Sequence, residues 1–75
     1  MDRRLLRHAR RRAGITVDEV AKAASLPYDR VYQVLEAGRL KWTPEVEVAL
    51  RKAVVRLLGE RARTCEEMLE KVNAA

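Results

Sequence analysis

Apolar residues recur along this chain at intervals of three and four, the spacing of one face of an α-helix. No segment alternates apolar and polar residues between turn signals, so no β-strand is predicted. The first four apolar stripes are Leu5, Leu6, Ala9 and Ala13; Val17, Val20, Ala21 and Ala24; Val31, Val34 and Leu35; and Val46, Leu50, Ala53 and Leu57. The pattern therefore predicts an all-α fold of four to five short helices.

Helix boundary signals divide the first half of the chain. Gly14 follows the first stripe and is expected to end its helix. Thr16 and Glu19 fit a capping box, and Ile15 with Val20 fits the hydrophobic staple that accompanies it. A second helix is therefore predicted over residues 17–24.

A turn and a third helix follow. Ser25, Leu26 and Pro27 interrupt the pattern, because proline disfavours helical geometry in the residue before it and suits a first helical turn. The third helix, YDRVYQVLEA, is expected to end at Gly38. Trp42 is expected to fill space in the core or in a dimer interface rather than to stack on a base.

The C-terminal part begins with a strong helix start, Thr43 as N-cap and Pro44 at the first position. Beyond Gly59 the apolar stripe moves on by one residue, to Leu58, Ala62, Cys65, Leu69 and Val72. Two helices, or one long helix that is kinked or re-phased near Gly59, would both explain this shift. We assign residues 1–58 to a DNA-binding domain and 59–75 to a candidate dimerisation helix.

Positive charge is concentrated in the first half of the chain. Residues 1–42 carry ten Lys and Arg against five Asp and Glu, which accounts for the whole net charge of +5. A basic excess confined to one region is the footprint of a nucleic-acid contact surface. A solvated, arginine-rich face is the alternative. The arginines of the first helix could contact flanking phosphates or simply keep that face soluble.

The segment ITVDEVAKAASLPYDRVYQVLEAGR, residues 15–39, is similar to the headpiece of the lactose-repressor family and, more distantly, to lambda-repressor-like (Xre-type) domains. The resemblance covers about residues 3–58. It implies a helix-turn-helix whose second helix contacts DNA bases through Tyr28, Asp29 and Gln33, with Thr16 at a phosphate. Ser25 replaces the usual turn glycine and Pro27 the usual polar cap. The family's hinge and sugar-sensing domain have no counterpart here, so sugar-responsive control is not carried over.

The chemistry of these residues leads to the same interpretation. Side chains at the start of a helix in the major groove lie nearest the base edges, where Gln33 suits adenine and Asp29 suits cytosine. Tyr32 is a further base-contacting candidate, although it could instead pack against the first helix, and Asp29 could simply stabilise its helix N-terminus. The expected phosphate contacts are Thr16, Ser25, Arg30, Arg39 and Lys41.

Enzymatic chemistry finds no support in the sequence. His8 has no evident partner, and Cys65, with no histidine near it in sequence, is expected to be a buried thiol. Glutamates near the C-terminus match no metal-binding pattern. We therefore expect no catalytic residue, metal or cofactor. No apolar run approaches the roughly 20 residues of a membrane span.

These observations predict a sequence-specific regulator of transcription, acting as a repressor and binding double-stranded DNA as a homodimer. The expected dimer interface is Val55, Leu58, Ala62, Leu69 and Val72. Two alternatives remain: an antitoxin whose C-terminal helices hold a protein partner, and an architectural or recombination accessory protein that bends DNA. The expected location is the cytoplasm, on the nucleoid, in a prokaryotic, phage or plasmid setting.

Overall fold

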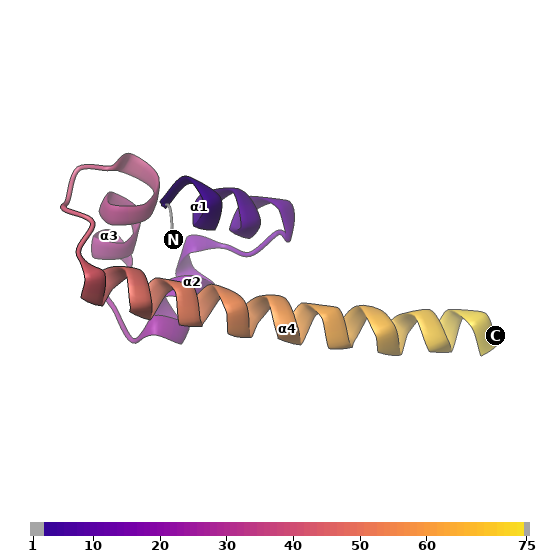
Figure 1. Cartoon of the computed structure of the whole chain (residues 1–75). Coiled ribbons are helices and arrows are strands. Elements are labelled where there is room, and N and C mark those ends of the chain that lie inside the picture. The colour runs from indigo at the N-terminus through magenta and orange to yellow at the C-terminus, as the bar shows by residue number, and fades with distance from the viewer. Residues whose placement is uncertain (1–2, 75) are drawn as a thin grey trace.

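The computed structural model describes residues 3–74, and every regular element in that range is a helix (Figure 1). The elements are α1 (Arg3–Arg12), α2 (Val17–Ala24), α3 (Tyr28–Val31), its π-helical continuation η1 (Tyr32–Ala37), and α4 (Pro44–Ala74). The predicted all-α class is confirmed. Because α3 and η1 run on without a break, the described chain has four helices, of which three are short and one is long.

The start of α2 follows from two residues that satisfy each other's backbone. The Glu19 N–H donates to Thr16 Oγ1 at 3.1 Å, and the Thr16 N–H donates to Glu19 Oε1 at 3.1 Å. Ile15 and Val20, on either side of this cap, are both buried. The predicted capping box is present, and Val17 is the first residue of α2 as expected.

The turn between α2 and α3 is closed by a residue in the left-handed conformation. Ser25 has φ 57° and ψ 42°, and its N–H donates to the carbonyl of Lys22 at 3.2 Å. The next N–H, that of Leu26, donates to the carbonyl of Ala21 at 3.0 Å. This arrangement ends α2 and turns the Leu26 side chain onto the core.

Ser25 carries a conformational penalty that glycine would not, because a Cβ crowds the backbone in the left-handed region. We expect Ser25→Gly to raise the free energy of unfolding by about 0.5–1 kcal/mol, and Ser25→Val to lower it. Urea unfolding of both variants beside the native chain measures this. A Ser25→Gly protein less stable than the native one would contradict the account of this turn.

The second half of the third helix is wider than the sequence pattern predicts. Residues Tyr32–Ala37 form a π-helix that ends at Gly38, whose φ is 66°. The Arg39 N–H donates to the Gln33 carbonyl at 2.9 Å and closes this end. Val34 and Leu35, adjacent in sequence, are both buried. The predicted extent of the helix is confirmed, whereas its backbone type was not foreseen.

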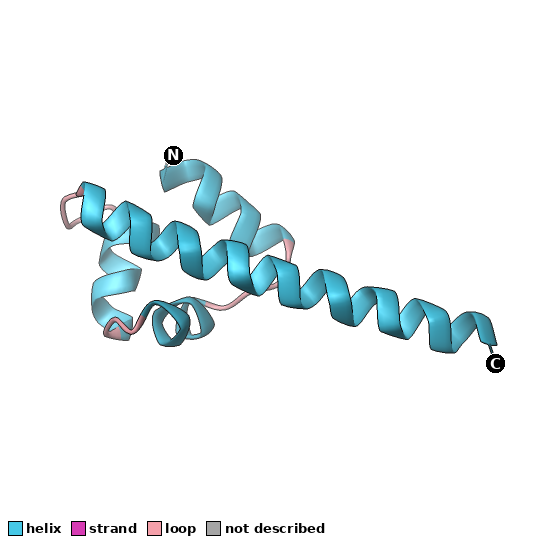
Figure 2. Ribbon diagram, turned by 60° about the horizontal axis from the view of Figure 1, so that its bottom comes forward, coloured by secondary structure: helices cyan, strands magenta, loops and turns pink. Residues whose placement is uncertain are grey.

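The core lies between α1, α2, the α3–η1 helix and the first half of α4, which packs on α1 and α2 (Figure 2). We call this part of the molecule the headpiece. Trp42 is half-buried and packs against the same core, which agrees with its predicted position in the core. The buried residues are Leu6, Ile15, Val17, Val20, Ala21, Val31, Val34, Leu35, Val46, Leu50, Ala53, Val54 and Leu57.

The last helix is a single element. It starts as predicted, with Thr43 Oγ1 accepting from the Val46 N–H at 3.3 Å, and it passes through Gly59 without interruption. The interpretation as two helices is therefore wrong, and the assigned boundary at 58/59 falls inside α4. The second half of α4 extends away from the headpiece, which gives the described chain extents of 49 × 20 × 17 Å (Figure 1).

Two further expectations about burial are wrong. Leu5 belongs to the apolar stripe predicted for the first helix, but its side chain is 53% exposed. Of the two leucines in this stripe, only Leu6 is buried in the core. Cys65 was expected to be buried and is exposed, because α4 has left the headpiece at that point. Within residues 3–74, no helix has a stretch long and apolar enough to cross a membrane.

Candidate nucleic-acid interface

The outward side of the α3–η1 helix carries the residues that the sequence singled out. Tyr28, Asp29 and Tyr32 are exposed, and Gln33 is half-buried. The opposite side of the same helix is fixed in the core by Val31, Val34 and Leu35. The outward side chains are therefore held on a rigid support while making few contacts of their own.

The two tyrosines form a pair. Their rings stack with centroids 6.3 Å apart and an interplanar angle of 16°. Tyr28 is 48% exposed and Tyr32 is 46% exposed, so neither ring belongs to the core. The alternative for Tyr32 was packing against the first helix, and the ring it stacks on is that of Tyr28.

Three basic side chains lie beside this surface. Arg30 is on α3, and Arg39 and Lys41 are in the loop that follows η1; all three are exposed. Within residues 3–74, none of them forms an ion pair, so their charges are available to an external anion. Pro27 at the N-cap provides no side-chain hydrogen bond, so the first amides of the helix are without a side-chain acceptor.

The other two predicted phosphate contacts differ from each other. Ser25 is exposed at the turn, and its hydroxyl makes no hydrogen bond to another described residue. Thr16 is exposed too, but its hydroxyl already bonds to the N–H and the carboxylate of Glu19. A phosphate at Thr16 would have to replace part of this cap.

The arginines of α1 are not a uniform solvent-exposed face. Glu36 Oε1 accepts from Arg10 Nη2 and from Arg11 Nη2, the latter at 3.0 Å. Arg10 also donates to the Ile15 carbonyl at 2.7 Å, and Arg7 donates to the Glu36 carbonyl at 3.4 Å. We call Arg7, Arg10, Arg11 and Glu36 the Glu36 cluster. It ties α1 to the end of η1, so Arg10 serves the fold rather than a phosphate.

The Glu36 cluster was missed by sequence reasoning. The Arg10 side chain is 12% exposed and that of Glu36 is 8% exposed, which makes this the least exposed ion pair of the described chain. The partners are 26 positions apart, and no local pattern connects them. The one available signal was that Glu36 is an acidic residue beside the apolar Val34 and Leu35.

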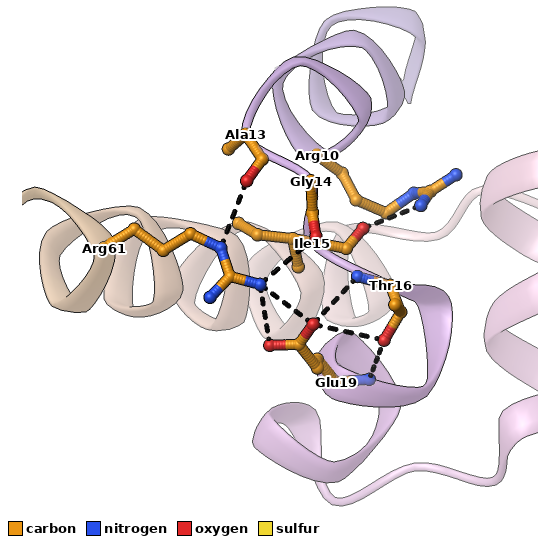
Figure 3. A network of polar contacts seen from close by, with 7 residues as sticks. All are labelled: Arg10, Ala13, Gly14, Ile15, Thr16, Glu19 and Arg61. Carbon is orange, nitrogen blue, oxygen red and sulfur yellow. Dashed lines mark hydrogen bonds and ion pairs between the residues drawn. The ribbon is translucent and has the colours of Figure 1, made fainter. Parts of the chain in front are cut away.

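A second long-range contact joins α4 to the turn between α1 and α2 (Figure 3). Arg61 Nε donates to the Ala13 carbonyl at 3.1 Å, and Nη2 donates to the Gly14 carbonyl at 3.2 Å. Nη2 also pairs with the carboxylate of Glu19, at 2.9 Å and 3.0 Å. The same carboxylate thus serves the α2 cap and Arg61. This contact holds α4 to the α1–α2 turn at the point where the helix leaves the headpiece.

These contacts lower the pKa of Glu19 below its ordinary value. The largest cause is the hydrogen bond from the Thr16 backbone N–H, followed by desolvation, which opposes it, and by the positive charge of Arg61. A carboxylate with a lowered pKa stabilises the folded state above its unfolded pKa, and this contribution is lost as the pH falls through the folded pKa.

Glu19→Gln is therefore expected to lower the melting temperature at pH 7 while flattening its decline on acidification below about pH 4.5. Glutamine keeps the shape and one hydrogen-bond acceptor but has no charge to lose. Melting curves of the native and variant proteins between neutral and acidic pH measure the effect. Parallel curves for the two proteins over the whole range would show that Glu19 does not contribute to acid sensitivity.

The predicted dimer residues lie mostly on the free half of α4. Val55, Leu69 and Val72 are 58%, 61% and 67% exposed, and Ala62 is exposed as well. Leu58 differs, because it is half-buried and packs against the headpiece core. A substitution at Leu58 would therefore disturb the headpiece, whereas one at Leu69 would not.

Comparison of the chain with protein-family models, with curated proteins and with solved structures gives no match. The resemblance to repressor headpieces thus stays a prediction from the residues themselves.

Proposed function

We propose that this protein binds double-stranded DNA in a sequence-specific manner, as a homodimer, and represses transcription by covering a promoter or operator. The observation that carries the proposal is the outward side of the α3–η1 helix. It presents Tyr28, Asp29, Tyr32 and Gln33 from a helix whose inner side is fully buried. Polar and aromatic groups on so rigid a support are suited to binding a surface of defined shape.

The arrangement of α2 and α3 supports the same proposal. The two helices are joined by the three residues Ser25, Leu26 and Pro27, and they pack on each other. The α2 helix also packs on α4, and η1, the continuation of α3, packs on α1. A short turn between two packed helices is the basis of the DNA-binding helix-turn-helix, in which the second helix enters the major groove. In the proposed complex, α3 is this second helix.

The proposed roles follow from the chemistry of each side chain. Gln33 pairs with adenine and Asp29 accepts a hydrogen bond from cytosine, while the stacked tyrosines contact neighbouring bases. Arg30, Arg39 and Lys41 bind phosphates and supply affinity without base preference. The Ser25 hydroxyl, at the turn, donates a hydrogen bond to a phosphate.

A homodimer is part of the proposal because one helix-turn-helix contacts only a few base pairs. Two copies related by a twofold axis bind two half-sites about one helical turn apart. The site is therefore an inverted repeat. On this proposal the protein acts on the nucleoid of a prokaryotic, phage or plasmid host.

Selection of bound duplexes from random DNA, followed by footprinting, tests the proposal. We expect enrichment of an inverted repeat with half-sites about 10 base pairs apart and a footprint that covers both. Binding without any enriched sequence, together with altered mobility of circularly permuted fragments, would instead show a DNA-bending accessory protein. Absence of DNA binding would contradict the proposal altogether.

A further inference from the structure

The free half of α4 exposes apolar side chains that the headpiece does not cover. This part of α4 extends past the other helices (Figures 1 and 2). Beyond Arg61 every described residue of the helix is exposed, including Met68, Leu69 and Val72. A helical segment of this length is only marginally stable alone in water, and most helices gain their stability by packing an apolar face. Packing of the exposed stripe against a partner would therefore stabilise this half of α4.

The spacing of this stripe is that of a coiled coil. Its six positions follow one another at alternating intervals of three and four: Val55, Leu58, Ala62, Cys65, Leu69 and Val72. They correspond to a and d of the heptad, with Val55 at a and Leu58 at d. The first pair, Val55 at a with Leu58 at d, has the β-branched and leucine arrangement that favours two strands, whereas the last pair, Leu69 at a with Val72 at d, has the reverse.

We propose that this stripe forms a parallel, in-register two-stranded coiled coil with a second copy of the same chain. Each of the six residues then packs against its own counterpart, in six layers from Val55 to Val72. Ala62 is the smallest of them and lets the two helices approach closely at the centre. The headpiece packs mainly on another side of α4, through Val46, Leu50, Ala53, Val54 and Leu57. It covers Leu58 in part and leaves Val55 exposed.

Charge at the flanking positions favours the parallel orientation. In a parallel pair, each g residue faces the e residue five positions further along the other helix, which sets Arg61 against Glu66 of the second copy. Arg61 bonds to the α1–α2 turn through Nε and Nη2, so Nη1 keeps its donors. An antiparallel pair that aligns the same six layers would set Arg61 against Met68, and Glu66 against Gly59, with no ion pair.

The position of α3 also favours the parallel orientation, and this step rests on the proposed function. The α3 helix lies at the end of the molecule where α4 begins, and the free half of α4 points the other way (Figure 1). A parallel pair brings both α3 helices to the same end of the dimer, where one duplex can contact both. An antiparallel pair would place them at opposite ends.

Disulfide trapping tests the orientation without DNA. Two variants each carry one cysteine, Val55→Cys with Cys65→Ala and Val72→Cys with Cys65→Ala, and are oxidised separately and as a mixture. The proposal predicts a covalent dimer from each variant alone. In the antiparallel pair Val55 faces Val72, and two Val55 positions are 17 residues, about 25 Å, apart. The matched control is Thr64→Cys with Cys65→Ala, on the outer side of α4, which should form no covalent dimer.

The outcomes are distinct. Covalent dimers that form only in the mixture would overturn the parallel orientation, and none above the Thr64→Cys level would overturn the coiled coil. Sedimentation of the native chain at tens of micromolar should show a dimer, and Leu69→Glu a monomer, while Thr64→Glu stays dimeric. A dimer that binds no DNA would refute the proposed DNA binding but not the coiled coil. A monomer that still binds a half-site would refute the coiled coil, and the homodimer with it, but not the DNA binding.

Discussion

Raising the salt concentration from about 50 to about 200 mM is expected to weaken binding of the proposed dimer to its DNA site about 1,000-fold. Lysines and arginines that bind phosphates release condensed counterions, so the logarithm of the affinity falls linearly with that of the salt concentration. With roughly six phosphates contacted per dimer the slope is near −5. On this proposal the main source of the effect is three exposed residues that form no ion pair within the described chain, Arg30, Arg39 and Lys41.

The assignment of these charges is tested by two double variants of equal charge. Arg39→Ala with Lys41→Ala should flatten the slope by up to about four in the dimer, one for each phosphate that is no longer bound, and leave sequence preference nearly unchanged. Arg63→Ala with Lys71→Ala removes the same charge from the free half of α4 and should leave the slope as it is. A native slope near zero would exclude phosphate binding as the main source of affinity.

Glu36→Ala is expected to lower the free energy of unfolding by about 3 kcal/mol. The substitution removes the acceptor that Arg10 and Arg11 share and leaves the Arg10 guanidinium, which is nearly buried, without a counter-charge. An unpaired buried charge costs far more than the pair contributed. Since α1 is held to the end of η1 by this cluster, we expect α1 to detach first. Urea unfolding measures the loss.

Two comparisons show whether burial is the cause. Glu60→Ala breaks an exposed pair with Arg56, four residues away on α4, and should cost only about 0.3–0.5 kcal/mol. Arg10→Met combined with Glu36→Leu replaces both charges by apolar groups and should recover most of the stability that Glu36→Ala loses. If Glu36→Ala and Glu60→Ala cost the same, the Glu36 cluster is not the anchor described here.

The elements that could be predicted are those specified by neighbours in sequence. The starts of α2 and α4 depend on residues that are close together in sequence, Thr16 with Glu19 and Thr43 with Pro44. The sequence therefore shows these starts directly. Gly38 was expected to end the third helix, and it follows η1 directly with a φ of 66°. Local chemistry of this kind does not depend on the rest of the fold.

The elements that could not be predicted depend on contacts between distant residues. Arg61 and Glu19 are 42 positions apart, and Arg10 and Glu36 are 26 apart, so their pairing follows only once the helices have packed. The exposure of Cys65 likewise depends on where α4 leaves the headpiece. Periodicity showed that its stripe is apolar, but it could not show whether the headpiece or another chain covers it.

The candidate interface likewise has features that the sequence could predict and features that depend on the folded structure. The exposure of Tyr28, Asp29 and Tyr32 followed from Val31, Val34 and Leu35, which occupy the inner side of their helix. The half-burial of Gln33 did not, because it lies in the π-helical turn that the periodicity did not show. Among the arginines, sequence alone could not separate Arg10, which is bound to Glu36, from Arg30, which is free of ion pairs within residues 3–74.

The central claim is that the α3–η1 helix contacts DNA bases, and binding titrations on specific and scrambled duplexes test it most directly. Gln33→Ala and Tyr28→Ala should each weaken binding to the specific duplex by about 1–3 kcal/mol, roughly 5- to 150-fold, and barely change binding to the scrambled one. Leu40→Ala, which truncates an exposed side chain beyond η1, is the matched control and should change neither. Melting curves should stay close to native for all three. Specific binding by Gln33→Ala and Tyr28→Ala as tight as that of the native protein would contradict the claim.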